Sequence, residues 1–367
     1  MELADELKAS LKQHLGWHKP RITCFVYLLL ALLRVRRMDL THIAVAMEGA
    51  SLISSRYRRL QRFFAHVRFD YDAFAKLIVH CFGFDHYYLT LDRTNWKWGK
   101  HDLNLLVLAI VYKGVAVPVY WLVLNKQGNS NQRERIALLK RFIRQFGSTG
   151  IKAVLGDREF VGQQWWQWLT EHRIPFVMRM KHNQNFRHPK GKQRPVKQLF
   201  CALSCGQSKV LRKTRMISGQ QIWLSALRLD SGEFLILASN FKQSDPFSIY
   251  AKRWEIESLF QALKGRGFHM ESTHLTRYFR IKKMMAVLAL AFVWAHKIGE
   301  WRDQQKPLKI KNHGRLEHSF FRYGLDYLGD QLHRRAQDAK EIVRLVLLLM
   351  IPWSIFEQLE PSLQRRN

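Results

Sequence analysis

Cysteine is scarce in this chain, which has four cysteines in 367 residues. Four are too few for a disulfide scaffold. Cys201 and Cys205 also lack a second Cys or His pair at the spacing of zinc ligands, so no structural zinc is expected. Long apolar runs are absent as well: the longest, residues 24–33 and 284–295, are too short to span a bilayer and predict buried helices. These shortages argue against a disulfide-rich exported domain and against a membrane-spanning protein.

Acidic residues are also in short supply. The chain has 29 Asp plus Glu against 60 Lys plus Arg, a net charge of +31, and residues 172–228 contain no acid. A field of this sign and size favours a polyanion, so nucleic acid is the expected partner. An anionic membrane surface is the alternative, but the sequence shows no basic amphipathic helix beside a lipidation signal.

An export signal is missing too. The first ten residues, MELADELKAS, are acidic and lead into no signal-peptide pattern, so a cytoplasmic protein with reduced thiols is expected. Internal repeats and low-complexity tails are absent. The length of 367 residues permits two or three domains with a sizeable core, and the hydrophobic content of 47% argues against disorder.

What the sequence does contain is a polar stripe within a predicted helix at 250–264. The stripe consists of four chemically unlike residues: Tyr250, Arg253, Glu257 and Lys264. At about 100° per residue they fall within about 60° of arc, and apolar side chains gather on another side. A surface ion pair between Arg253 and Glu257, at i,i+4 spacing, is the simplest interpretation. A carboxylate beside cations and a phenol also suits a metal-bound phosphodiester, because the acid can hold the metal while the others hold phosphates.

Upstream of this stripe, strand and helix signals follow one another in a defined order. The signals predict three strands, a helix, a strand, a helix and a strand, at 87–92, 103–112, 115–124, 133–146, 151–157, 161–172 and 175–180. With the first three strands antiparallel, this is the order of an α/β, RNase H-like fold, in which strands lie in the middle and helices cover both faces.

Asp92 and Asp157 each end one of the predicted strands. In an RNase H-like fold the first and fourth strands are adjacent, so the two carboxylates would lie side by side. Paired acids repel each other unless a cation lies between them, which predicts a divalent metal site. Taken singly, each Asp would be interpreted as a turn or cap residue.

These elements resemble a known family. The stripe is similar to the Tyr-x2-Arg-x3-Glu-x6-Lys signature of bacterial cut-and-paste DDE transposases of the insertion-sequence-four type. The strings DRTNWKWG, which begins at Asp92, and GDREFVG, which contains Asp157, look like the first-acid and second-acid blocks of that family. The aromatic and aliphatic positions around Glu257 also match, and the three blocks occur in the family's order.

The resemblance implies a metal-dependent reaction. Asp92, Asp157 and Glu257 would hold two Mg2+ ions, or Mn2+, about 4 Å apart. One ion would activate water or a 3′-hydroxyl, and the other would stabilise the leaving oxygen. Arg253 and Lys264 would contact phosphates near the scissile end, together with a hydrogen bond from the stripe's tyrosine.

The resemblance also implies the biological reaction and the partners. Such an enzyme would nick double-stranded DNA at each inverted repeat of a mobile element, could pass through a hairpin, and would join both 3′-hydroxyl ends to target DNA. Cutting two ends together implies a homodimer assembled on DNA. No membrane partner is implied, and the setting would be the cytoplasm of a bacterium.

Residues 1–80 predict a helical domain. A short helix capped by Asp39 or Thr41 would be followed, after a turn, by a second short helix. The second helix carries four arginines with no acid between them: Arg56, Arg58, Arg59 and Arg62. It would suit DNA phosphates or a groove, whereas a solvated basic face is the alternative. The resemblance favours binding to the ends of the element.

A catalytic domain is expected at 81–300, with a basic insertion at 181–245. Charge of one sign over this length indicates a phosphate-binding surface or a flexible loop, and strand signals at 208–239 favour a folded, β-rich insertion. Trp223 lies in one of these strands and is interpreted as a core residue. The resemblance raises the alternative that an aromatic residue here holds a flipped base. Residues 301–367 predict further helices, which could mediate dimerisation.

Two other functions stay open on the sequence alone. A nuclease with the same fold would use the acids and the metal for hydrolysis only. A non-catalytic DNA-binding protein would keep the fold without the chemistry. The cations near Glu257 and the basic insertion favour strand transfer, because that reaction must hold two duplexes, and the presence of all three acids counts against the non-catalytic alternative.

Overall fold

The computed structural model describes residues 3–188, 191–312, 314–334, 339–352, 354–356 and 358. Its chain forms two compact units. The first unit contains Met1–Phe84, Asn95–Leu103 and Leu259–Asn367, and the second contains Asp85–Thr94 and Asn104–Ser258. The expected catalytic domain at 81–300 is thus divided between the two units. Parts of the predicted insertion and C-terminal region, 189–190 and 359–367, lie outside the described residues.

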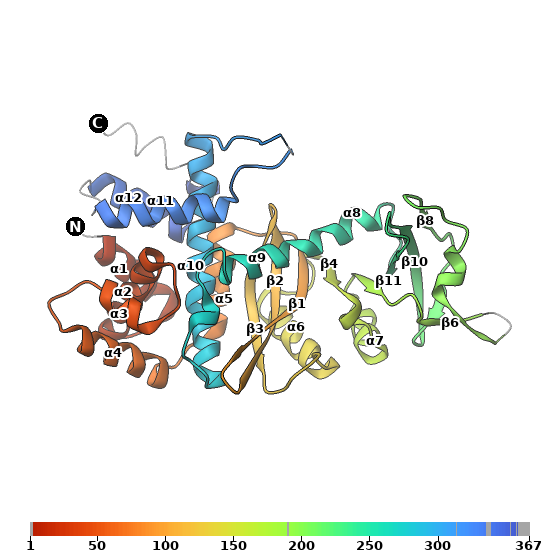
Figure 1. Ribbon diagram of the computed structural model, residues 1–367, viewed down its shortest axis with the longest axis horizontal. Coiled ribbons are helices and arrows are strands. Elements are labelled where there is room, and N and C mark those ends of the chain that lie inside the picture. The colour runs from red at the N-terminus through yellow and green to blue at the C-terminus, as the bar shows by residue number, and fades with distance from the viewer. Residues whose placement is uncertain are drawn as a thin grey trace. The chain divides into compact units, whose positions relative to one another are not determined.

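The first unit is helical. Its helices are α1 (Leu3–Leu15), α2 (Lys19–Val35), α3 (Leu40–Ala46), α4 (Ile53–His66), α5 (Tyr71–Phe82), the short 3-10 helix η4 (Met270–Ser272), α10 (Tyr278–Gln305), α11 (Phe320–Arg334) and α12 (Ala339–Met350). In Figure 1, α10 is the long helix against which α5 and α11 pack. Asp39 caps α3 by accepting a hydrogen bond from the Thr41 backbone N–H, as predicted.

Helix α10 forms the core of this unit. Every residue from 284 to 295 is fully buried, which confirms the buried helix predicted there. Its later part packs closely against α11: a Cβ on Gly299 would lie 1.7 Å from the Phe320 carbonyl oxygen, and one on Gly324 would lie 1.9 Å from that of Ala295. Glycine is therefore required at both positions, because any side chain would collide with backbone. Among the described helices, none is long and apolar enough to cross a membrane.

The second unit contains a β-sheet and the helices that connect its strands. Its first elements are β1 (Tyr87–Trp98), β2 (His101–Tyr112), β3 (Val115–Leu124), α6 (Gln132–Phe146), β4 (Ile151–Gly156), the 3-10 helix η1 (Arg158–Phe160), α7 (Gln163–Glu171) and β5 (Phe176–Met180). The strands lie in the order β3-β2-β1-β4-β5 (Figure 1), with β2 and β3 antiparallel and β4 parallel to both β1 and β5. This confirms the predicted RNase H-like α/β fold.

Strand β1 is longer than the sequence predicted. Asp92 was expected at its end, but β1 continues to Trp98 and is joined to β2 by a turn at Gly99 and Lys100. Gly99 has φ 55°, a left-handed conformation that glycine adopts without a steric penalty. The tight turn lets residues beyond Asp92 stay extended, so Asp92 lies within a strand.

The insertion is folded and continues the same sheet. Its elements are β6 (Asn185–Arg187), β7 (Gln193–Pro195), the 3-10 helix η2 (Val196–Phe200), β8 (Ser208–Val210), β9 (Arg215–Ile217), β10 (Gln220–Arg228) and β11 (Phe234–Ser239). Strand β11 pairs antiparallel with β5 and with β10, so the insertion extends the sheet of β1 to β5. Many of its cations are exposed, among them Arg187, Lys192, Arg194, Lys197, Lys209, Arg212 and Lys213.

The segment that carries the polar stripe is not one continuous α-helix. It consists of α8 (Pro246–Ala251), the 3-10 helix η3 (Lys252–Trp254) and α9 (Glu255–Leu263), and Lys264 follows the end of α9. A 3-10 turn has three residues per turn instead of 3.6, so a stripe calculated for a single α-helix does not hold across it. Glu257 and Arg253 nevertheless keep the i,i+4 contact.

Candidate active site and basic surfaces

Asp92 and Asp157 lie on neighbouring parallel strands. The β1–β4 register pairs Thr90 with Leu155, and each aspartate follows its member of this pair by two residues. The two carboxyl groups therefore lie at the same level, on strands about 4.8 Å apart. The negative charge of Asp157 also acts on Asp92, where it raises the pKa. The predicted adjacency of the first and fourth strands is confirmed.

Local backbone contacts fix one oxygen of each carboxylate. Asp92 Oδ1 accepts a hydrogen bond from the Arg93 backbone N–H at 2.7 Å. Asp157 Oδ1 accepts one from the Glu159 N–H at 2.8 Å and so caps η1. Gly156 makes this turn feasible, because a Cβ there would lie 2.8 Å from Phe160 Cβ. The two acids are therefore held in defined orientations.

Arg253 joins the first acid to the third. Its Nη1 lies 3.3 Å from Asp92 Oδ2, and its Nη2 donates to Glu257 Oε1 at 2.9 Å. The ion pair expected from the i,i+4 spacing is present. It is not a surface pair, because Arg253 is 6% exposed. A single guanidinium thus holds the β1 carboxylate and the α9 carboxylate in one cluster.

The Tyr250 ring lies beside the Arg253 guanidinium. Tyr250 is 3% exposed and packs with Ala153, Leu155 and Val177 in the core of the sheet. The Arg253 guanidinium lies 5.8 Å from the centre of its ring. Burial raises the pKa of the Tyr250 hydroxyl, which keeps it a hydrogen-bond donor at neutral pH. Its contact with a DNA phosphate stays a prediction, since the side chain has little exposed surface in this structure.

Glu255 anchors the start of α9 to the sheet. Its Oε2 accepts a hydrogen bond from the Tyr112 backbone N–H at 2.9 Å, at the turn between β2 and β3. Burial raises the pKa of this carboxyl, while the hydrogen bonds from the Tyr112 and Gly114 backbones oppose the rise. This contact fixes α9, and with it Glu257, relative to the strands that carry the other acids.

A buried polar network, which the sequence did not predict, ties the two aspartate segments together. Arg93, next to Asp92, contacts both carboxylate oxygens of Glu159 through Nε at 2.7 Å. Glu159 Oε1 also accepts from the Ser130 N–H and hydroxyl at 2.8 and 2.7 Å. The buried Arg135 donates to the Ser130 hydroxyl at 2.9 Å. The strings DRT and DRE contain this pair, but their separation in the sequence concealed the contact.

Arg93 extends the network to two further elements. Its Nη1 donates to Asn104 on β2 at 3.1 Å, and its Nη2 donates to Asn129 at 3.0 Å. Asn104 in turn donates to the carbonyl oxygens of Lys126 and Gly128. The acids are therefore carried by strands whose ends are cross-linked to the loop before α6.

The electrostatics of the cluster favour a bound cation. Burial raises the pKa of Asp92 to about 6; the Arg93 N–H and the Arg253 charge oppose this rise, and the charges of Asp157 and Glu159 add to it. An ionised Asp92 is thus destabilised by its surroundings at neutral pH. Any cation that reached its free side would relieve this cost.

Asp92→Asn is expected to stabilise the metal-free protein at pH 7.5 by about 1–3 kcal/mol, at 1.36 kcal/mol per pKa unit. The folded-state pKa of Asp92 lies above the ordinary aspartate value of 3.8, so the native protein loses stability as pH rises from about 4 to 6. The side chain of Asp92 is 19% exposed, which limits solvent screening. The measurement is urea unfolding in EDTA at pH 4 and 7.5. A variant less stable than wild type at pH 7.5 would contradict this account.

The three carboxylates fit a hard divalent metal by their chemistry, since Mg2+ prefers oxygen ligands. Across the described ranges, however, no three His, Cys, Asp or Glu side chains are gathered closely enough to hold a metal ion. The Arg253 guanidinium contacts one oxygen of Asp92 and one of Glu257. The donor set is therefore suitable, and a metal would compete with Arg253 for it.

Lys264 belongs to the first unit, whereas the other residues of the stripe belong to the second. Its ammonium donates to the Asn95 carbonyl oxygen at 3.2 Å and pairs with Glu271 at 2.8 Å. These contacts tie the segment after α9 to the end of β1. A phosphate contact through Lys264 stays a prediction.

The four arginines of α4 have different surroundings. Arg56 donates to the carbonyl oxygens of Met47 and Gly49, so it fixes the loop before the helix. Arg58 and Arg62 line an open hollow of about 680 Å³ together with Ser54, Ser55, Gln61, Ala65, His66 and Arg280. Arg59 is exposed outside this hollow. Sequence reasoning missed Arg280, because it reaches α4 from the start of α10.

Neither Ser54 nor Ser55 caps α4. The N-cap residue is Leu52, and no side chain caps the helix. Both serines instead lie in the first turn, where they line the same hollow as Arg58 and Arg62. Their hydroxyl groups are thereby available to a ligand.

Trp223 lies on β10, opposite Ser239 of β11, and is half-buried. It is flanked by the buried Ile222 and Leu224, as expected for a strand residue. Trp254 is more accessible, with 55% of its surface exposed, and its ring lies 4.7 Å from the Arg253 guanidinium. A base-holding role for Trp223 stays a prediction.

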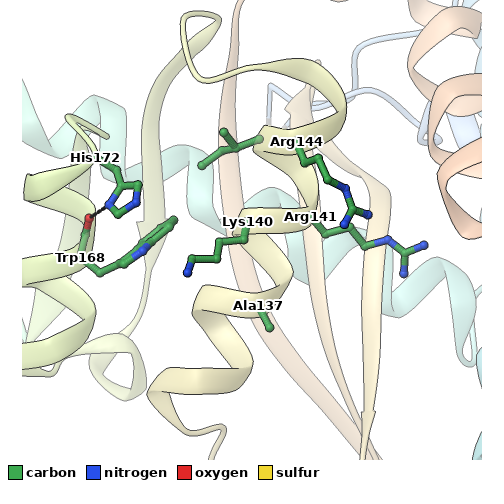
Figure 2. Close-up of a pocket in the computed structure, with 7 residues that line it drawn as sticks. Ala137, Lys140, Arg141, Arg144, Trp168 and His172 are labelled. Carbon is green, nitrogen blue, oxygen red and sulfur yellow. Dashed lines mark hydrogen bonds between the residues drawn. The ribbon is translucent and has the colours of Figure 1, made fainter.

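A second basic hollow lies between α6 and α7 in the second unit. Figure 2 shows Lys140, Arg141 and Arg144 on α6; the Lys140 side chain points toward Trp168, whereas the other two point away from it. The Trp168 ring is already packed, since His172 lies 4.2 Å and Trp165 6.0 Å from it between ring centres. This hollow of about 720 Å³ can therefore offer positive charge, but no free aromatic face for a base.

Comparisons with known proteins follow this geometry. Residues 83–294, more than half of the chain, match the family described as "Transposase DDE domain". No curated protein sequence matches the chain. Among solved structures, the fold is similar to one described as "Cryo-EM structure of piggyBac transposase synaptic complex with hairpin DNA". That similarity has a TM-score of 0.48 and 11% identity, and covers 96% of this chain and 83% of the other.

Proposed function

The chain belongs to the transposase DDE domain family, and we propose that it cleaves DNA at the ends of a mobile element and joins the freed 3′-hydroxyl ends to target DNA. The observation that carries this proposal is the placement of the three acids in the fold. Asp92 and Asp157 lie on adjacent parallel strands, and Glu257 is linked to Asp92 through Arg253. The acids are separated widely in the sequence and come from three elements, which is the arrangement that metal-dependent phosphoryl transfer needs.

The three acids are proposed as the ligands of two divalent ions, Mg2+ or Mn2+. When bound, such ions supply an activated water or 3′-hydroxyl and stabilise the leaving oxygen. The chain itself contributes carboxylates that are pre-oriented by the Arg93 and Glu159 N–H groups and a third carboxylate fixed through α9. The raised pKa of Asp92 supports this role, because burial makes its carboxylate a stronger partner for a cation.

Arg253 is proposed to supply, in the absence of metal, the positive charge that the carboxylates need. In this structure it neutralises Asp92 and Glu257, which would otherwise repel each other across the cluster. With those carboxylates engaged by a metal, the guanidinium would be free to hold a phosphate of the scissile strand. Lys264 and Tyr250 are proposed to contact neighbouring phosphates, as the family signature implies.

Finer assignments also belong to this proposal. The insertion-sequence-four type is supported by the Tyr250, Arg253, Glu257 and Lys264 spacing, although 3-10 helix η3 interrupts the helix. The arginines of α4 are proposed to contact the element ends, and the protein to act as a homodimer on double-stranded DNA in a bacterial cytoplasm. Trp223 is proposed as an aromatic residue near a flipped base.

A strand-transfer assay tests the proposal. Purified protein, Mg2+ and a plasmid that carries candidate element ends are incubated, and wild type is compared with Asp92→Ala. Joined products that require Mg2+ and vanish with the variant are expected, because Asp92 is a metal ligand in the proposed site. Cleavage without joining would replace the proposal by a nuclease with the same fold. Binding that is equal in both forms, with no cleavage across the candidate ends, would favour a non-catalytic DNA-binding protein.

A further inference from the structure

The hollow between α4 and the start of α10 has the composition of a phosphate site. Three arginines and a histidine line it, together with two serines and a glutamine: Arg58, Arg62, Arg280, His66, Ser54, Ser55 and Gln61. All of these side chains can donate hydrogen bonds, and no acid lines the hollow. We infer that this hollow binds phosphates of the DNA backbone, with Arg280 as a contact residue.

The arrangement is costly without an anion. Arg58 and Arg62 are separated by one helical turn, where like charges repel each other. Arg280 adds a third guanidinium from another helix. Its positive charge also helps burial to lower the pKa of Lys283, one turn further along α10. In the described part of the chain, no salt bridge joins Arg58, Arg62 or Arg280 to an acid.

The Arg280 side chain is held at the edge of the hollow, and its Nε is buried. The rest of the side chain lies beside Phe279, with the guanidinium 5.7 Å from the ring centre. The stem is therefore supported by an aromatic ring, while its donors serve the hollow.

The neighbouring residues hold this geometry. Lys283 donates to the Phe64 carbonyl oxygen at 2.9 Å, which ties the first turns of α10 to the end of α4. Leu60, Phe63 and Phe64 are buried, so the opposite face of α4 is fixed in the core. The basic face is thus presented on a rigid support, and it can bind an anion without first being ordered.

An extended polyanion fits better than a free anion. The hollow is open and measures about 680 Å³, room for roughly twenty water molecules at about 30 Å³ each. Arg58, Arg62 and His66 are exposed along one side of α4 over two turns. Backbone phosphates carry no sequence information, so this site would position any duplex. The inference rests on the proposed function, and it adds a residue far from α4 in the sequence.

The test is the salt dependence of binding to a random-sequence DNA duplex in EDTA. Arg280→Gln and Arg58→Gln are each expected to reduce the slope of log K against log salt by about 1, since each removes one phosphate contact. Arg280→Lys keeps the charge and is expected to keep the slope. Arg68→Gln, an exposed arginine just beyond α4 and outside the hollow, is the matched control and should leave the slope near wild type.

Thermal unfolding monitors whether each variant folds. If Arg280→Gln does not fold, Arg280→Lys provides the conservative variant for the comparison. A wild-type salt slope in Arg280→Gln, or an equal reduction of the slope in Arg68→Gln, would overturn the inference. Strand transfer by the wild type would still leave the proposed function intact. Binding of inorganic phosphate with no effect of Arg280→Gln on duplex binding would reduce the hollow to a free-anion site. Failure of the wild type to bind or cut any DNA would count against the proposed function itself.

Discussion

Glu257→Gln and Asp157→Asn are each expected to reduce Mg2+-dependent cleavage and joining at least about a thousandfold, while DNA binding stays close to wild type. Loss of one carboxylate ligand removes several kcal/mol of transition-state stabilisation, and each 1.36 kcal/mol corresponds to tenfold in rate. The basic surfaces that would bind DNA are untouched by either change. In Glu257→Gln the contact with Arg253 is kept, because an amide oxygen can still accept the hydrogen bond from the guanidinium.

Glu255→Gln is the matched control for this experiment. Glu255 lies two residues before Glu257 on the same helix, but its carboxylate faces the Tyr112 backbone N–H, which an amide oxygen can also accept. Cleavage by this variant should therefore stay within a few fold of wild type. Cleavage and DNA binding are measured on the same preparations. Full cleavage by Glu257→Gln would remove Glu257 from the metal site, and equal loss in Glu255→Gln would point to a disturbed helix instead.

Glu159→Gln is expected to destabilise the protein by about 3–5 kcal/mol, the usual cost of removing one partner of a buried ion pair. Glu159 is 11% exposed and accepts hydrogen bonds from Arg93 and Ser130, with Arg135 nearby at 3.7 Å. Neutralising it leaves the buried Arg135 and the partly buried Arg93 without their acid. Urea unfolding at pH 7.5 measures the change, and Glu171→Gln, an exposed acid on α7, serves as the control.

The same variant should also lower activity, since Arg93 and Glu159 cross-link the segments that carry Asp92 and Asp157. A positioning role predicts that higher metal concentrations restore part of the cleavage at a temperature where Glu159→Gln is folded. A merely structural role predicts normal metal dependence in the folded fraction. Unchanged stability would show that the network contributes less than its burial suggests.

The sequence by itself determined the element order of the catalytic sheet and two of its acid positions. Period-two and helical patterns are local, so the start of β1, strands β2 to β5 and helices α6 and α7 could be placed within a few residues. Asp157 follows β4 because Gly156 permits the turn, and the four-residue spacing of Arg253 and Glu257 produces their contact. The buried α10 followed from an uninterrupted apolar run.

The tertiary structure alone decided which distant residues meet. The Arg93–Glu159 clamp, the approach of Arg280 to α4 and the burial of Tyr250 and Arg253 depend on packing between elements, and no local pattern encodes them. The position of Asp92 inside a longer β1 and the 3-10 turn before α9 likewise arise from contacts across the sheet. Local sequence sets which backbone conformations are cheap, whereas the side chains that become neighbours, and the pKa values that follow, are set by the folded core as a whole.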